Sequence, residues 1–162
     1  MVKRRKYDLF LLLSLSLFIL IAGCSEKKES PPERNKIIKK VTNDYIKAAI
    51  NNDFNKMYEL LSAEDKAAIS SEEYLKRQQY LQEKSSKVVM KSGEIKKIKV
   101  SKKEAVVEME LETQAPHPVP ITKVLVYEKG SWYVVLSPEN KQELSIGKSF
   151  EEFQKEHPPA GP

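Results

Sequence analysis

The chain has 162 residues and a formal net charge of +5, and 40% of its residues are hydrophobic. This length suits one ordinary globular domain and is too short for two. The small basic excess argues against a nucleic-acid-binding surface. A single cysteine excludes an intrachain disulfide and any metal site built from several cysteines, so a hydrophobic core must stabilise the fold.

The first 23 residues have the layout of a secretory signal. A basic stretch at 3–6 precedes an apolar run at 9–22, and small residues lead into Cys24. The apolar run is shorter than the roughly 20 residues that a membrane-spanning helix needs. We therefore expect cleavage of residues 1–23, which removes four basic residues and one acidic residue and leaves 139 residues with a net charge of +2. A plain signal without lipidation and a retained membrane helix are the alternatives.

The end of this segment resembles the lipobox of bacterial lipoproteins. Ile21 lies three residues before Cys24, two small residues lie between them, and the chain becomes polar directly afterwards. The resemblance implies cleavage after Gly23, a thioether-linked diacylglycerol on Cys24 and further acylation, as with palmitate. Two acyl chains give stable anchoring, where one chain gives only marginal binding. The resemblance therefore implies a protein at the cell membrane, lipid-anchored on its extracytoplasmic face.

Residues 24–35 are expected to form a flexible tether. They are rich in Glu, Lys and Ser, contain two adjacent prolines, and offer no large apolar side chain to bury. The folded domain is expected over 36–140, where the apolar residues become periodic. The tether would hold this domain away from the membrane.

The apolar residues between Ile37 and Leu81 recur every three or four positions, which predicts helices. The expected helices span 37–49, 54–61, 62–69 and 70–81. Asp53 is placed to cap the second of them. Ser70 with Glu73 three residues later has the spacing of a capping box and opens the last.

Short β-branched runs replace the helical period after Ser86. The expected strands span 95–100, 105–112, 121–128 and 131–136. A turn is expected at Ser92-Gly93 and a tight hairpin at Lys129-Gly130, and the three prolines in 115–120 indicate a loop or an edge. Helices followed by antiparallel strands predict an α+β fold, in which the N-terminal helices pack on one face of a curved sheet.

Residues 141–162 are expected to form a C-terminal extension. Ser149 and Glu152 have the spacing that opens a short helix. The tail from His157 to Pro162 is rich in proline and is expected to fray.

Three strings in the helical half resemble one known domain. They are 45–49, 51–62 and 69–74, and the hairpin at 128–132 agrees with them. The pattern resembles the nuclear-transport-factor-two-like domain at the N-terminus of some penicillin-binding proteins and in related lone lipoproteins. The resemblance covers 36–136. It implies a cone-shaped, cystatin-like or nuclear-transport-factor-two-like α+β fold that carries no catalytic residue.

The interior of such a cone is the expected site. The side chains expected to fill or line it are Tyr45, Phe54, Tyr58, Tyr74, Met109 and Trp132. A solid cone favours a scaffold, and an open apolar cavity favours a carrier of a small ligand. An open cavity that holds a buried carboxylate favours an enzyme.

The sequence offers little for catalysis or metal binding. The Ser-x-x-Lys spacing of penicillin-binding enzymes occurs at 25–28 and 145–148, without a Lys-Thr-Gly partner. Tyrosines with Asp44 or Asp53 as a base are the enzymatic alternative, but tyrosines more often fill cores. His117 and His157 have no partner at ligand spacing, so we expect no catalytic residue, no metal and no cofactor.

These observations favour a lipid-anchored, non-catalytic binding or scaffolding module at the bacterial cell envelope. Its expected partners are the membrane, through the lipid on Cys24, and an envelope protein or a cell-wall component, but not nucleic acid. The first alternative is a carrier of a small apolar ligand in the cone. An enzyme of the same fold is the second alternative.

Overall fold

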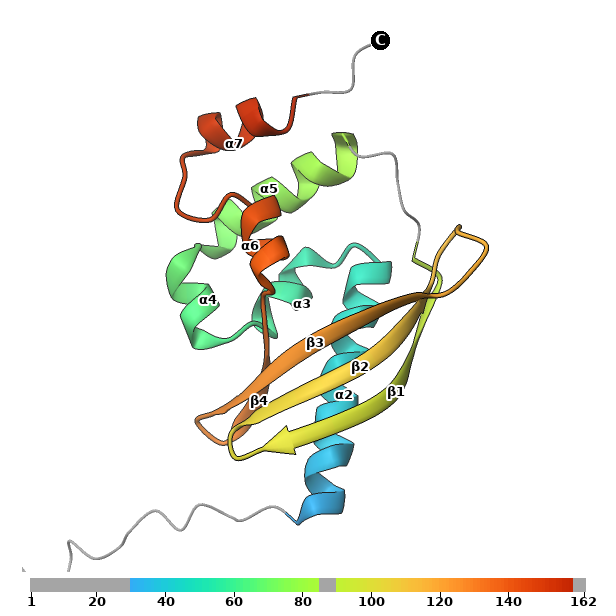
Figure 1. The fold of residues 1–162 in the computed structure, drawn as a ribbon. Helices are drawn as coiled ribbons and strands as arrows, with labels where there is room; N and C mark the ends of the chain where they lie inside the picture. Colours follow the sequence, from blue (N-terminus) through green and yellow to red (C-terminus); the bar gives the residue numbers. More distant parts are fainter. Residues whose placement is uncertain (1–29, 85–89, 159–162) are drawn as a thin grey trace, which may run out of the picture.

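The computed structural model describes residues 30–84 and 90–158, and the expected signal and Cys24 lie outside this part (Figure 1). The elements are α2 (Pro31–Ile50), α3 (Phe54–Glu59), α4 (Ala63–Ala68), α5 (Ser71–Lys84), β1 (Ser92–Ser101), β2 (Glu104–Glu112), β3 (Val119–Glu128), β4 (Ser131–Val135), α6 (Pro138–Glu143) and α7 (Phe150–Glu156). The strands form one antiparallel sheet in the order β1-β2-β3-β4, and α2 crosses one face of it. The predicted α+β architecture is confirmed.

Helix α2 begins at Pro31, inside the segment expected to be a tether. A proline at the first helical position loses no hydrogen bond, because that N–H has no partner within the helix, and its fixed φ suits the helix. The backbone N–H of Arg34 donates to the carbonyl of Ser30 at 2.9 Å. The first fully buried side chain is Ile38, so the helix starts several residues before the core does.

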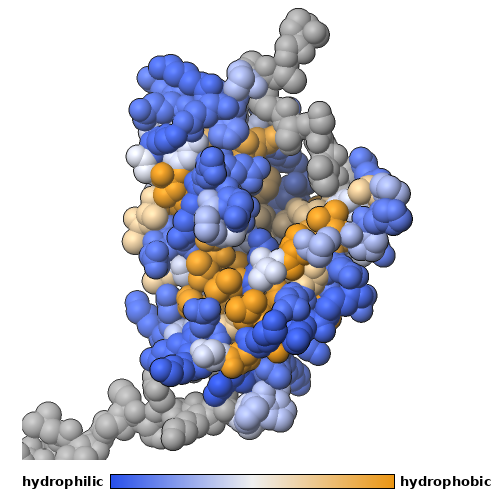
Figure 2. All heavy atoms as spheres, viewed as in Figure 1, coloured by the Kyte–Doolittle hydropathy of each residue, from blue (hydrophilic) through white to orange (hydrophobic). Residues whose placement is uncertain are grey.

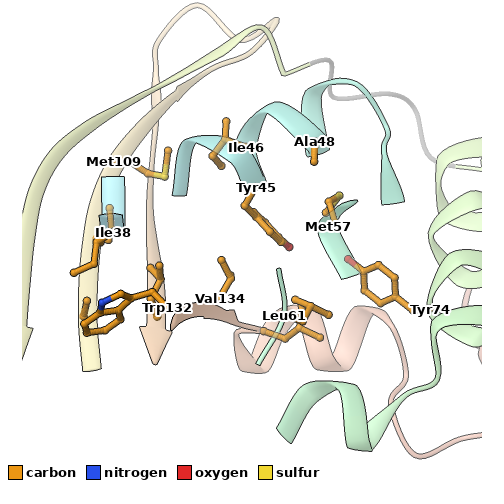
Figure 3. Close-up of a cluster of buried hydrophobic side chains, with 14 of the residues drawn as sticks. Ile38, Tyr45, Ile46, Ala48, Met57, Leu61, Tyr74, Met109, Trp132 and Val134 are labelled. Atoms are coloured by element: carbon orange, nitrogen blue, oxygen red, sulfur yellow. The ribbon is translucent and has the colours of Figure 1, made fainter. Parts of the chain in front are cut away.

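Strand β2 defines the inner face of the sheet, which α2 covers. Its buried residues are Ala105, Val107, Met109 and Leu111, and the intervening side chains are less buried. This alternation confirms the predicted strand. Together with side chains from α2, α3, α5 and β4 they form the core shown in Figure 3.

Gly93 lies within β1, opposite Leu111, and not in the expected turn. A Cβ at this position would lie 3.0 Å from Leu111 Cδ2 and 3.1 Å from Ile46 Cγ2. Glycine therefore serves the close approach of α2 to the sheet. The turn expected at Lys129-Gly130 is present, and both residues have positive φ, 49° and 85°, as a two-residue hairpin turn requires.

The C-terminal residues belong to the folded domain, in contrast to the extension expected over 141–162. Figure 1 shows α6 and α7 beside α5. Phe153 is fully buried, and Ser149 and Glu152 form the predicted capping box at the start of α7. The expected fraying does not begin at His157, because its carbonyl accepts from the Tyr80 hydroxyl at 2.9 Å.

Arg77 of α5 holds the segment before α7. Its guanidinium is 2% exposed and donates to the carbonyls of Leu144, Ser145 and Lys148, the last two at 2.7 and 2.6 Å. Glu73 accepts from the same guanidinium at 2.6 and 2.9 Å. The sequence suggests that Ser70 and Glu73 together cap α5. In the structure only Ser70 does so, by accepting from the Glu73 N–H, and the Glu73 carboxylate binds Arg77 instead.

Candidate functional site

A cavity of about 520 Å³ lies between α2, the inner face of the sheet and α6. Its apolar lining includes Ile46, Ala49, Met57, Leu111, Ile121 and Leu136. Its polar lining includes Tyr45, Gln78, Lys123, Asn140 and Glu143. The lining residues lie between 45 and 144, so the cavity forms only when segments distant in the chain come together. Its size lies within the usual range of small-molecule sites, roughly 300–1,000 Å³.

Lys123 is the cation of this cavity. It lies on β3 opposite the fully buried Val107, which places it on the inner face of the sheet. Its ammonium lies 5.2 Å from the centroid of the Tyr45 ring, within the range of a cation–π contact. Burial lowers the pKa of Lys123, and the charge of Glu143 partly opposes this shift. Among residues 30–84 and 90–158, no carboxylate lies within 4 Å of this ammonium.

Tyr45 and Tyr74 bring their hydroxyl groups toward one another from α2 and α5 (Figure 3). Tyr74 is fully buried, and burial raises the pKa of its hydroxyl to about 12. Burial also raises the pKa of Tyr45 well above its ordinary value, and the Tyr74 hydroxyl adds to this. Both tyrosines therefore stay protonated near neutral pH, which makes them poor proton-transfer groups.

Only Tyr45 of the six expected cone residues lines the cavity. Tyr74, Met109 and Trp132 lie in the packed core, where each is at most 2% exposed. Phe54 and Tyr58 are half-buried and pack against the core. The Tyr58 hydroxyl donates to the carbonyl of Ile69 at 3.1 Å. The sequence pattern identifies the inward face of an element, but not the part of the interior that stays unfilled.

The carboxylates considered as bases have structural roles. Asp44 pairs with Lys40 at 2.6 Å, and Asp53 caps α3 by accepting from the Lys56 N–H at 3.0 Å. Neither lines the cavity. The glutamates that do line it, at 139 and 143, are exposed to solvent.

Asp65 is fully buried but does not line the cavity. Its carboxylate accepts from the Ser62 hydroxyl at 2.8 Å and from the Leu136 N–H at 2.9 Å. The ammonium of Lys141 lies 2.9 Å from its other oxygen. Asp65 therefore ties α4 to the end of β4 and to α6. The spacing of Ser62 and Asp65 marks the start of α4 in the sequence, but the contacts of Asp65 with Leu136 and Lys141 connect distant residues, so sequence reasoning missed this role.

The Ser-x-x-Lys spacing at 145–148 does not form a nucleophile and its base. Ser145 is 3% exposed, and its hydroxyl donates to Glu156 Oε2 at 2.6 Å. The ammonium of Lys148 pairs with the other oxygen of Glu156. A nucleophile needs a free base in reach and access to the substrate. Ser145 is buried, and the lysine of the spacing pairs with Glu156 and not with the serine. The other such spacing, at 25–28, lies outside the described residues.

The described part of the chain holds no candidate metal centre. Within it, no group of three His, Cys, Asp or Glu side chains is arranged to hold a metal ion. No helix in the same residues is both long and apolar enough to cross a membrane.

The outer face of the sheet carries charge pairs beside half-buried valines. Lys96 lies 3.1 Å from Glu110 across the strands, and Lys99 pairs with Glu108. Figure 2 shows hydrophobic residues among charged ones over the sheet in this view. Two of the β1 lysines therefore belong to a solvated strand face, where they pair with glutamates of β2.

Comparison with known proteins finds likeness to solved structures but none to curated sequences. No protein-family model matches the chain, and no curated protein sequence matches it. Among solved structures, a Campylobacter jejuni protein described as a candidate NTF2-like transpeptidase aligns with a TM-score of 0.44 and 14% sequence identity. The alignment covers 67% of this chain and 100% of that chain. At this TM-score the likeness adds no argument to the topology described above.

Proposed function

We propose that this protein is a lipid-anchored, non-catalytic binding module at the extracytoplasmic face of a bacterial cell membrane, with a ligand site in its cone. The observation that supports a ligand site is the cavity of about 520 Å³ between α2, the inner face of the sheet and α6. A pure scaffold, which the sequence favours first, has no need of such a space. The mostly apolar lining of the cavity favours the alternative in which the protein carries a small ligand.

The absence of a catalytic role rests on the chemistry of the lining. The cavity brings together a lysine, a protonated tyrosine and two exposed glutamates. Catalysis by a side chain needs a second group held against it as its acid or base, and among the described residues no carboxylate lies within 4 Å of the Lys123 ammonium. Ser145, the only described serine of a Ser-x-x-Lys spacing, is buried at another place in the fold. These features support a site that binds without reacting.

Replacement of Cys24 by alanine is expected to abolish lipid labelling and membrane attachment. The lipobox resemblance makes the cysteine sulfur the acceptor of the diacylglycerol, and alanine has no such group. Metabolic labelling with a radioactive fatty acid and membrane fractionation measure the two effects. The natural chain is the control. A variant that still partitions with membranes like the natural chain would overturn the proposed anchoring.

An apolar fluorescent probe is expected to bind in the cavity. The mature chain with Cys24→Ser keeps every described residue and needs no detergent. Titration with N-phenyl-1-naphthylamine should give saturable fluorescence. Ala49→Phe should fill part of the cavity and lower the affinity for the probe at least about tenfold. The apolar contact that the phenylalanine ring would take from the probe is worth over ~1 kcal/mol of binding free energy.

The matched control for Ala49→Phe is Ala67→Phe, on α4 and away from the cavity lining. Both variants need unchanged circular dichroism for the comparison. Saturable binding that Ala49→Phe leaves intact would place the probe elsewhere. No saturable binding at all would favour the scaffold and contradict the ligand site.

A further inference from the structure

The inner face of the sheet is apolar except at one position of β3. Ile121 and Leu125 precede and follow Lys123 by two residues and share its face, and Val107 pairs with it across the sheet. Removing an ammonium from water carries a free-energy cost unless an opposite charge or a hydrogen bond replaces the water. Lys123 is half-buried, so its ammonium has lost part of its water and gains from a partner in the cavity.

The described part of the chain supplies only a partial partner for the Lys123 ammonium. The face of Tyr45 attracts the ammonium, but an aromatic ring is a weak substitute for a carboxylate or a carbonyl oxygen. Glu143 lines the same cavity from α6 and acts on Lys123 only as a longer-range charge, since no ion pair within 4 Å joins them. The three N–H donors of Lys123 are thus available to a ligand in the cavity.

We propose that the cavity binds an amphiphile with one negative charge, such as a medium-chain carboxylate, whose headgroup pairs with Lys123 while its hydrocarbon part lies against Ile46, Met57 and Leu111. This proposal rests on the proposed ligand site. A single lysine faces two glutamates around the lining, at 139 and 143. That balance favours a monoanion over a dianion such as a phosphate monoester, because the glutamates repel each added negative charge.

Displacement of the fluorescent probe tests the charge preference with a matched pair of ligands. Dodecanoate and dodecanol have the same chain length and differ in the charged headgroup. In the mature chain with Cys24→Ser, dodecanoate is expected to displace the probe at about a tenfold lower concentration than dodecanol, the effect of one charge-assisted hydrogen bond. Dodecyl phosphate is expected to compete less well than dodecanoate.

Four variants locate the charge. Lys123→Met should remove the preference for dodecanoate and leave dodecanol displacement unchanged, whereas Lys123→Arg should keep the preference. Lys129→Met changes a lysine in the exposed β3–β4 turn and should have no effect. Lys123→Gln provides a second neutral variant if the methionine variant does not fold.

The outcomes separate this proposal from the one on which it rests. Absence of probe binding in the natural cavity overturns the ligand site itself. Probe binding with equal displacement by dodecanoate and dodecanol overturns the charge preference alone. A preference that survives Lys123→Met and Lys123→Gln also overturns the role of Lys123. The pairing of β3 with β4 begins at Val124, so the part of β3 that holds Lys123 has no β4 residue beside it. Self-association of these variants with an unchanged preference would instead assign Lys123 to protection of this free edge, against our proposal.

Discussion

Replacement of Trp132 by alanine is expected to lower the free energy of unfolding by about 3–5 kcal/mol, as large aromatic truncations do. The side chain is 2% exposed and packs in the cluster with Ile38 and Val134 (Figure 3). Tyr127, which pairs with it across the β3–β4 hairpin, has its ring centroid 5.3 Å away. Domains of this size have only ~5–15 kcal/mol of stability, so the loss would be a large part of the total.

Urea denaturation followed by circular dichroism measures this change without the fluorescence of the mutated residue. Trp132→Phe is the matched control. The indole N–H is buried and has no hydrogen-bond partner among the described residues, so phenylalanine removes an unsatisfied donor while it keeps an aromatic ring. We expect this variant to lose less than half as much stability. Equal stability of Trp132→Ala and the natural chain would show that the ring does not fill the core.

Replacement of Arg77 by alanine is expected to cost about 3–5 kcal/mol, the usual effect of breaking a buried charged network. Three backbone carbonyls between 144 and 148 would lose their donor, and Glu73 would lose its partner. Ser145 and Gly147 hold the positive φ values of 46° and 90° that belong to this tight segment. Without Arg77 the segment and α7 should detach from α5 before the rest of the domain unfolds.

Amide hydrogen exchange is the sharpest measurement, because it reports on 144–158 separately from the sheet. Arg77→Lys keeps the charge but cannot present the five donors of a guanidinium. We expect intermediate exchange rates for that variant. Unchanged protection of 144–158 in Arg77→Ala would mean that the apolar contacts of Phe153 suffice to hold α7.

Local signals in the sequence predict the elements well, and for a physical reason. The capping box at Ser149 and the alternation along 105–112 depend on residues close together in the chain, and both are present as predicted. The composition around the two adjacent prolines indicates a tether, although Pro31 is the first residue of α2. A proline fits both roles, so composition alone cannot separate them.

The site is harder to predict because its contacts connect distant residues. Lys123 has the same strand parity as Ile121 and Leu125, and this parity is the one local signal that marks it as inward-facing. Arg77 and Asp65 have local partners in Glu73 and Ser62. No local signal indicates the backbone groups that they also bind, which lie 67–71 residues away. The cavity lies where the side chains of α2, β3 and α6 leave space between them, and this depends on contacts between elements that are distant in the sequence.

Helix α2 runs from the N-terminal end of the described domain toward the cavity, so the start of the helix and the cavity lie far apart. Ile46 approaches Gly93 at the start of β1, so the beginning of α2 lies near the other end of the strand, where the β1–β2 turn is (Figure 1). At 1.5 Å per residue, Ala49 in the cavity lining lies about 27 Å along the helix from Pro31. Six peptide units from Cys24 to Ser30 add at most about 22 Å. If Cys24 is the anchor and α2 stands along the membrane normal, a ligand bound in the cavity would lie well clear of the lipid headgroups. Direct exchange of that ligand with the bilayer would then require the domain to tilt toward the membrane.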